Sequence, residues 1–368
     1  MANTPKTKTD HVRLFLPGPV EVRPEILDAQ TDWMIGHRSG EFTNLYARMQ
    51  QKLQKLFGTD QARVYIYTSS GSGVWESASR CAVRDDRKIL HLTSGSFSER
   101  WAEVSQLNGK TVDVVSADWG KAVKPEQLEE ALKKDTYDAV AVVYNETSTG
   151  VLQPVPDYAE IMKQYDDTLF MVDMVSCFAG APVHYDEWGL DVALTSTQKA
   201  FALPPGMAFG AVSDQVLTRA EQIPHRGYYF DMLQMEKYHK KNNTPATPPI
   251  SLMFAADRQL DDILEETIEA RVARHQKMAE MTQEWATSAG FELFAEEGFR
   301  SPTLTTLSNN LNVPVSEMNA FLRERGMVVS NGYGAIKDKT IRIAHMGDCQ
   351  PEHLEVLFEA IEDYLQQR

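Results

Sequence analysis

The sequence predicts an α/β protein, with a large domain built on an open, mostly parallel β-sheet and a smaller C-terminal α+β domain. Short apolar runs alternate with amphipathic stretches between Arg63 and Gly210, and this alternation is typical of a parallel sheet covered by helices. Residues ~211–250 interrupt the alternation with a Pro- and Thr-rich stretch. A long charged helix from about Ser251 to Ser288 and further short elements then indicate a second domain.

Several of the predicted strands of the large domain are apolar on both faces, as strands between two helical layers must be. Helices are expected between them, for example Pro125 to Lys134 and Asp157 to Tyr165. Ligands of such sheets bind beyond the carboxyl ends of the strands, so the residues after each run are candidates for a site. The runs are Val64–Thr68, Lys88–Leu92, Thr111–Val115, Ala139–Val143, Leu169–Val172 and Asp191–Leu194.

The C-terminal part is predicted to combine helices and strands. The helices are Val315–Arg325 and Pro351–Gln367, and the strands are Met327–Ser330 and Thr340–Ala344. The expected division of the chain is an N-terminal arm over residues 1–19, a large domain over 20–255 and a small domain over 256–368.

Composition and charge exclude several classes of protein. The 37 Lys and Arg residues against 52 Asp and Glu residues give a net charge of −15, which argues against a nucleic-acid partner. No stretch approaches the ~18 apolar residues that a membrane span needs. The polar first ten residues lack the apolar segment of a secretory signal, which favours a frayed tail and a cytoplasmic protein. The cysteines Cys81, Cys177 and Cys349 are far apart, so neither a disulfide framework nor a metal site is expected.

A run of small residues follows the first predicted strand of the large domain. Ser69-Ser-Gly-Ser-Gly73 precedes a helix that opens at Val74. Small residues at such a junction let backbone N–H groups and the helix dipole approach an anion closely. Taken alone, an ordinary strand-to-helix turn accounts for the run better than a phosphate site does.

Two charged residues follow neighbouring apolar runs. Asp173 ends Leu169-Phe-Met-Val-Asp173, where a lone acid is costly unless a cation or hydrogen-bond donors meet it. An N-cap or a structural ion pair would also account for it. Lys199 lies in Thr195-Ser-Thr-Gln-Lys-Ala200 after the next run. Desolvation beside a phosphate would make its amine a candidate for Schiff-base chemistry, and a surface lysine at a strand exit is the alternative.

Arg342 lies inside the apolar run Thr340-Ile-Arg-Ile-Ala344. Its stem can pack while its head reaches water, or its guanidinium can grip a carboxylate with two hydrogen bonds. A phosphate cradle, an acid, a lysine and an arginine at one sheet edge are together what a pyridoxal 5'-phosphate (PLP) enzyme needs. The cradle holds the phosphate, the lysine binds the aldehyde carbon, the acid keeps the ring nitrogen protonated, and the arginine orients the amino acid.

The chain resembles the class V aminotransferases, in particular the alanine–glyoxylate and serine–glyoxylate branch. The most specific segments are Asn145-Glu-Thr-Ser-Thr-Gly-Val-Leu-Gln-Pro154, Val172-Asp-Met-Val-Ser176 and Ser196-Thr-Gln-Lys199, and the likeness extends from Leu16 to Gly347. The resemblance implies PLP fold type I, which is aspartate-aminotransferase-like, with a mostly parallel seven-stranded sheet in the large domain. It also implies a homodimer with shared active sites. The implied reaction moves an amino group from alanine or serine to glyoxylate or pyruvate through a Lys199 aldimine.

The resemblance also implies a role for individual residues. Lys199 and Asp173 would be catalytic, and Arg342 would bind the substrate carboxylate. Phe97 stands where relatives often have Trp, stacked on the cofactor ring, and Thr247 would arrive from a partner subunit, with Thr244 as the alternative alignment. The implied cofactor-binding set is Ser72, Gly73, Val74, Phe97, Thr147, Asp173, Val175, Gln198, Lys199 and Thr247.

Three alternatives remain open. The stretch Gly36-His-Arg-Ser-Gly-Glu-Phe42 is similar to one in phosphoserine aminotransferases, where a His–Arg pair binds the substrate phosphate. His37 and Arg38 are therefore candidate substrate-binding residues, although Arg38 can simply pair with Glu41. A cysteine desulfurase would need a cysteine ahead of Arg342, and Cys349 follows it. A catalytically inactive binding module is disfavoured by the intact pair of Lys199 and Asp173.

Overall fold

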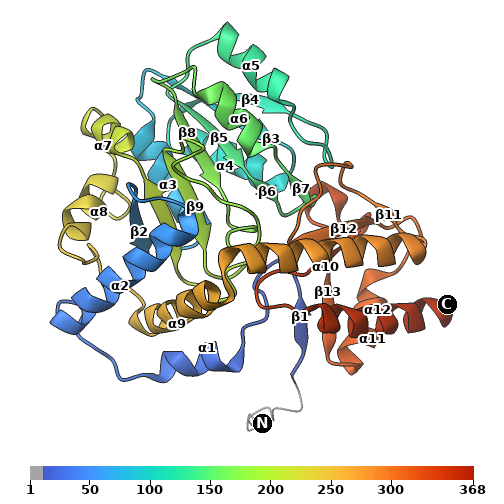
Figure 1. Ribbon diagram of the computed structural model, residues 1–368. Coiled ribbons are helices and arrows are strands. Elements are labelled where there is room, and N and C mark those ends of the chain that lie inside the picture. Colours follow the sequence, from blue (N-terminus) through green and yellow to red (C-terminus); the bar gives the residue numbers. More distant parts are fainter. Residues whose placement is uncertain (1–10) are drawn as a thin grey trace.

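The computed structural model describes residues 11–368, and these residues form a seven-stranded, a five-stranded and a two-stranded β-sheet, with helices packed on the two larger ones (Figure 1). The expected frayed tail over residues 1–10, and with it the start of the expected arm, lies outside the described residues. The helices are α1 (Pro24–Asp28), α2 (Gly40–Phe57), α3 (Gly71–Ala82), α4 (Ser96–Leu107), α5 (Pro125–Lys134), α6 (Val155–Met162), α7 (Asp214–Glu221), α8 (Met232–His239), α9 (Ile250–Glu266), α10 (Ile268–Ser288), α11 (Val315–Glu324) and α12 (Pro351–Gln366).

The large sheet has seven strands in the order β2-β10-β9-β8-β5-β3-β4. Its neighbours pair in parallel except around β10, which is antiparallel to both β2 and β9. Because β10 is antiparallel to both of its neighbours, β2 runs in the same direction as β9 and the other parallel strands. The strands are β2 (Arg63–Tyr67), β3 (Lys88–Thr93), β4 (Thr111–Ser116), β5 (Ala139–Val143), β8 (Leu169–Asp173), β9 (Val192–Ser196) and β10 (Ala208–Val212).

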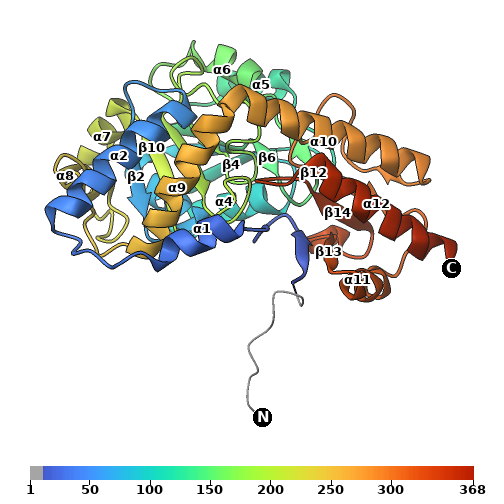
Figure 2. The same cartoon turned by 60° about the horizontal axis from the view of Figure 1, so that its bottom comes forward.

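The large sheet is buried on both faces, as its apolar runs predict, except along the edge strand β4, whose residues are exposed or half-buried. Alternate residues of one strand enter different cores: Val140 and Val142 of β5 pack with α2, α5, α6 and α9, whereas Ala139 and Ala141 pack with α3, α4, α7 and α8. Figure 2 shows α2 and α9 side by side on the near face of this sheet. The sheet is thereby the middle layer of three, and only its edges and strand ends remain for a site.

The small sheet has the order β1-β13-β14-β12-β11 and joins the two ends of the described chain. β1 pairs in parallel with β13, so residues near the N-terminus complete a C-terminal sheet. The expected boundary at 255/256 falls inside α9, and the domain division stays a prediction. The remaining strands are β1 (Arg13–Phe15), β6 (Asn145–Glu146), β7 (Val151–Leu152), β11 (Glu292–Leu293), β12 (Leu304–Ser308), β13 (Met327–Asn331) and β14 (Thr340–Ala344).

The expected single helix from Ser251 to Ser288 is wrong, because the chain forms two helices there. α9 ends and α10 begins at Thr267, whose φ of 70° is left-handed and breaks the helical ladder. The Thr267 side chain then accepts a hydrogen bond from the backbone N–H of Ala270 as the N-cap of α10. α10 crosses from the large sheet to the small one (orange in Figure 1), so the break lies where the two parts meet.

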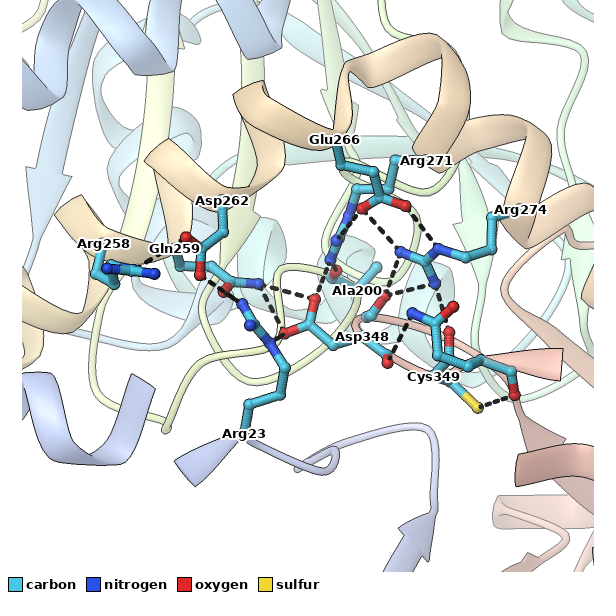
Figure 3. A network of polar contacts seen from close by, with 12 residues as sticks. Arg23, Ala200, Arg258, Gln259, Asp262, Glu266, Arg271, Arg274, Asp348 and Cys349 are labelled. Atoms are coloured by element: carbon cyan, nitrogen blue, oxygen red, sulfur yellow. Dashed lines mark hydrogen bonds and ion pairs between the residues drawn. The ribbon is translucent and has the colours of Figure 1, made fainter. Parts of the chain in front are cut away.

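A buried network of charges joins the two parts beside this break (Figure 3). Arg271 of α10, with a side chain 3% exposed, pairs with Glu266 and with Asp348, each at 2.9 Å. Its guanidinium also donates to the carbonyl oxygens of Ala179 at 3.1 Å and Ala200 at 3.4 Å. Asp348 follows β14, and Ala200 follows Lys199, so this one arginine ties the small domain to the Lys199 loop.

We expect Arg271→Met to lower the free energy of unfolding by about 1–3 kcal/mol. The variant leaves the carbonyls of Ala179 and Ala200 without this donor and removes one of the two arginines that pair with each of Glu266 and Asp348. The matched control is Arg258→Met in the same network. Arg258 pairs with Asp262 across one helical turn and its side chain is 57% exposed, so its loss should cost about 0–1 kcal/mol. Urea unfolding measures both. Equal effects for the two variants would contradict the buried role of Arg271.

No helix among residues 11–368 combines the length and the apolar character needed to cross a membrane.

Candidate active site

Five strands of the large sheet deliver residues to one pocket, because their carboxyl ends lie at the same edge. The pocket opens to solvent, and the free space within it and at its mouth is about 420 Å³. Lys199 and Asp173, the two predicted catalytic residues, both line it. Its lining is Ser70, Gly71, Ser72, Trp75, Phe97, Val143, Asn145, Thr147, Asp173, Val175, Ser196, Gln198 and Lys199.

Asp173 is the last residue of β8 and is 2% exposed. Its carboxylate accepts a hydrogen bond from Trp75 Nε1 at 2.6 Å and from the backbone N–H of Val175 at 2.7 Å. Burial raises the pKa of Asp173 to about 6, although these two donors and the nearby Lys199 cation favour the ionised form. The carboxylate is thus held in one orientation at the floor of the pocket and can stabilise a cationic ring nitrogen.

Lys199 follows β9 and is 8% exposed. Its Nζ donates to Thr147 Oγ1 at 2.8 Å and lies 4.8 Å from the centre of the Phe97 ring. Burial lowers the pKa of Lys199 to about 8, and the Asp173 carboxylate only partly opposes that shift. A neutral amine is therefore accessible near physiological pH, as nucleophilic or general-base chemistry at nitrogen requires.

The lowered pKa of Lys199 predicts a pH dependence. Only the neutral amine attacks an aldehyde, so covalent capture of PLP by the apoprotein should accelerate as pH rises, with a midpoint near 8. Asp173→Asn should lower this midpoint, because the carboxylate favours the protonated amine. Stopped-flow absorbance at a series of pH values measures the rate. A midpoint near 10.5, the ordinary value for lysine, would show that burial does not act as described.

Glu146 is a fully buried acid that shapes the wall of the pocket. Its carboxylate accepts the backbone N–H groups of Phe97 and Ser98 in the first turn of α4, as well as the hydroxyls of Ser98 and Ser148. The carboxylate thereby caps α4, where negative charge is favourable. Phe97 is held in place as a result, with its ring toward Lys199.

Arg342 lies on β14 of the small sheet and reaches the pocket through Thr147. Its Nη1 donates to the Thr147 carbonyl at 3.1 Å, its Nε to the Asn331 carbonyl at 3.0 Å and its Nη2 to Ser330 Oγ at 2.9 Å. Burial lowers its pKa to about 10, so the guanidinium stays charged at neutral pH. Within residues 11–368 no acidic side chain forms an ion pair with it.

Several predicted site residues do not line this pocket. Gly73 and Val74 lie in the first turn of α3, where a Cβ on Gly73 would stand 2.6 Å from Ser69 Oγ and 2.9 Å from the Phe230 ring. His37, Arg38 and Thr247 lie on other segments. The suggested pairing of Arg38 with Glu41 is wrong, because Arg38 instead donates to Asn243 Oδ1 and to the carbonyl of Thr244 at 2.7 Å.

The pocket also contains residues to which the sequence pattern assigns no role. Trp75 binds Asp173 from one turn along α3, and Asn145, Ser196 and Gly71 face the same space. Trp75 follows the small-residue run and has the pattern of an ordinary apolar helix residue, since nothing local indicates a partner 98 positions away. Gly71 and Ser196 belong to the small-residue run and to the Lys199 segment, so their positions in the chain are the signal that could identify them.

Comparison with known proteins extends this picture. A family model described as aminotransferase class-V matches residues 26–344. An uncharacterized aminotransferase of Methanocaldococcus jannaschii is 35% identical, over 96% of this chain and 93% of the relative. A serine–glyoxylate aminotransferase of Methylorubrum extorquens is 31% identical, over 95% and 89%. The crystal structure of an alanine–glyoxylate aminotransferase from Nostoc sp. superposes with a TM-score of 0.93 at 28% identity, covering 99% of this chain and 98% of that chain.

Proposed function

Because this chain belongs to the class V aminotransferase family, we propose that it moves an amino group from alanine or serine to a keto acid of the glyoxylate or pyruvate type. The family and the fold make it a transaminase. The choice of substrates rests on the relatives named for serine or alanine and glyoxylate. It also rests on Arg342, whose guanidinium donates to Thr147 at the pocket and forms no ion pair with an acidic side chain among residues 11–368.

Class V aminotransferases of this fold use PLP, and the pocket fits that cofactor. Among the described residues, Asn145 Oδ1, Ser196 Oγ and Gln198 Oε1 are buried without a hydrogen-bond partner, and all three residues line the pocket. Such atoms are costly unless a ligand satisfies them. A Cβ on Gly71 would stand 2.8 Å from Val175 Cγ2 and 3.7 Å from Ser196 Oγ, so glycine leaves open the space a ligand needs. The side chain of Ser70, the N-cap residue of α3, accepts no hydrogen bond from the helix. The backbone N–H groups of the first turn are therefore available to a phosphate.

The proposed roles follow from these contacts. PLP, when bound, supplies an electron-accepting ring conjugated to the substrate nitrogen. Asp173 would keep a proton on the ring nitrogen, and Lys199 would move a proton at the substrate Cα. Phe97 and Val175 would pack against the ring and exclude water. Ser72 and Gln198 would hold the phosphate, and Thr147 would contact the ring oxygen.

The contacts of Arg342 provide the main structural support for the proposal. A guanidinium has five N–H donors, and three of them are used by Asn331, Thr147 and Ser330. Two N–H groups remain, one on each terminal nitrogen, which is the arrangement that grips a carboxylate with two parallel bonds. A buried cation of this kind, without an acidic partner among residues 11–368, supports an anionic substrate at this position.

We expect Arg342→Ala to lower kcat/KM for every amino donor and keto acceptor by about 10–150-fold, equivalent to about 1.5–3 kcal/mol for a hydrogen bond to a charged group. The loss should be common to all substrates because each one carries the carboxylate. Arg342→Lys keeps the charge and loses the fork, so it should recover only part of the activity. Steady-state kinetics with two donors and two acceptors measure the effect. A defect confined to one substrate would instead place Arg342 at a side-chain subsite.

We also propose a homodimer in which each site receives residues from the other subunit. Thr244 is buried and its hydroxyl donates to the Ala246 carbonyl at 2.8 Å, whereas Thr247 is exposed. That difference favours Thr247 as the residue that reaches a partner's phosphate. Arg38 bonds to the loop that carries both threonines, so His37 and Arg38 would lie at the same interface. A cytoplasmic location stays a prediction from the sequence.

Phosphoserine is the alternative donor, and the position of Arg38 weakens it. The Arg38 guanidinium donates to Asn243 and to the carbonyls of Thr244 and Pro245, and none of these groups lines the pocket that holds Lys199. The test adds alanine, serine, aspartate and phosphoserine one at a time to the holoenzyme, and follows loss of cofactor absorbance. Conversion with alanine or serine supports the proposal. Conversion with phosphoserine alone would overturn it, and Arg38→Ala would then show whether this arginine is responsible.

A further inference from the structure

Tyr333 links the predicted carboxylate-binding arginine to the aromatic wall of the pocket. It lies in the loop between β13 and β14, and its ring stacks on Phe97 with centroids 5.3 Å apart and planes inclined by 19°. The guanidinium carbon of Arg342 lies 5.6 Å from the centre of the Tyr333 ring. The Tyr333 ring therefore contacts both Phe97, which lines the pocket, and the guanidinium of Arg342.

The loop that carries Tyr333 is held in place on both sides. At its base the backbone N–H of Gly332 donates to the Thr340 carbonyl at 2.8 Å. Gly334 has a φ of 58°, and a Cβ on it would lie 3.2 Å from the Trp119 ring and 3.6 Å from Ser96 Oγ. The backbone on either side of Tyr333 is thus anchored to β14 and packed close to the start of α4.

Arg100 holds the end of the ring. Its Nη2 donates to the Tyr333 hydroxyl at 2.9 Å. Its guanidinium carbon lies 5.4 Å from the Phe97 centroid and 5.8 Å from the Tyr333 centroid, within the range of cation–π attraction. In the part of the chain that the structure describes, no carboxylate pairs with Arg100. Arg100 lies one turn along α4 from Phe97, and its polar contact is with the hydroxyl of Tyr333.

We infer that Tyr333, clamped by Arg100, is the residue that restricts the amino donor to small side chains. The inference rests on the proposed function, since it concerns the same pocket. A donor held by its carboxylate at Arg342 and by its Cα beside Lys199 must direct its side chain past Phe97 and Tyr333. A stacked and hydrogen-bonded ring leaves little room there, whereas alanine and serine side chains need little. Tyr333 acts as a specificity-determining residue, and Arg100 as a positioning residue that acts through it.

The test compares kcat/KM for phenylalanine and for alanine, both with glyoxylate. Tyr333→Ala should raise the ratio of phenylalanine to alanine by about 10-fold or more, the scale of discrimination by side-chain bulk. Arg100→Met removes the clamp and keeps an apolar stem, so it should move the ratio in the same direction by less. Tyr333→Phe keeps the ring and loses the hydroxyl that Arg100 binds, so it should match Arg100→Met. The matched control is Arg325→Met, since Arg325 also lies over an aromatic ring, that of Phe321, far from the pocket.

A second readout does not depend on turnover. The dissociation constants of propanoate and 3-phenylpropanoate are measured by ligand-observed NMR with wild type and with each variant. Tyr333→Ala should tighten 3-phenylpropanoate relative to propanoate. An unchanged ratio in both measurements would overturn the inference while wild-type conversion of alanine leaves the proposed function intact. Failure of wild type to convert either alanine or serine would instead contradict the proposed function.

Discussion

Lys199→Ala should abolish transamination, with a loss of more than about 10³-fold, while the protein still folds. The reason is that, in the proposed function, one amine would serve two purposes: it would hold the cofactor covalently and would move the proton at the substrate Cα. Its 8% exposure and its hydrogen bond to Thr147 Oγ1 place that amine inside the pocket. The residues proposed to hold the phosphate are Ser72 and Gln198, so the variant should retain PLP without a covalent bond.

The measurement is the transamination rate together with the absorbance of bound PLP after gel filtration. The matched control is Lys110→Ala, because Lys110 is also buried, at 7% exposed, and pairs with Asp85 at 2.7 Å away from the pocket. That variant should keep its activity even if its stability falls. Reduction of the wild type with borohydride, followed by peptide mapping, should find PLP on Lys199. Attachment to another lysine would contradict the assignment.

Asp173→Asn should slow removal of the Cα proton by about 10²–10⁴-fold, with a much smaller effect on PLP binding. The amide cannot stabilise a cation on the ring nitrogen, and loss of one partner of a buried ion pair costs about 3–5 kcal/mol. The contacts from Trp75 and Val175 would hold an amide in much the same position, so the defect should be electrostatic. Single-turnover stopped-flow with alanine measures the rate, and equilibrium dialysis measures PLP binding.

Asp191→Asn is the control for this variant. Asp191 is a second buried acid. It lies just before β9, at the end of that strand opposite to Lys199. Its carboxylate accepts hydrogen bonds from the backbone N–H of Phe170 and from Ser213 Oγ. Burial raises its pKa as well, but it does not line the pocket. Its replacement should affect stability and leave the single-turnover rate close to wild type. Equal rate defects for the two variants would show that replacing Asp173 slows the reaction by disturbing the fold and not by removing a charge from the pocket.

Much of the fold follows from local sequence pattern. Six strands of the large sheet coincide with apolar runs, and α5 spans Pro125–Lys134 as expected. The seventh strand, β10, has no such run, because Ala208-Phe-Gly-Ala-Val212 combines alanines and a glycine, residues with low strand propensity. The break at Thr267 involves neither Gly nor Pro, so no residue there signals the end of a helix. Helices α7 and α8 lie in the stretch that the sequence pattern marks only as an interruption.

Some features of the site can be predicted from the sequence, and others cannot. Asp173 and Lys199 can be proposed from sequence because a charge directly after a buried strand is costly unless a partner or a ligand meets it. The pairing of Trp75 with Asp173 and the stack of Tyr333 on Phe97 join distant segments, and no local pattern indicates them. The contacts of Arg38 with the loop at Thr244 are of the same kind. Such contacts depend on the packed fold rather than on neighbouring residues.

Transfer of nitrogen from one substrate to the other distinguishes a transaminase from an enzyme that only releases the amino group. The holoenzyme is incubated with ¹⁵N-alanine and unlabelled glyoxylate, and the products are followed by NMR and mass spectrometry. We expect ¹⁵N-glycine and pyruvate in equal amounts, with no transfer by Lys199→Ala. Recovery of ¹⁵N-alanine and glyoxylate unchanged, or release of the label as ammonia without ¹⁵N-glycine, would contradict it.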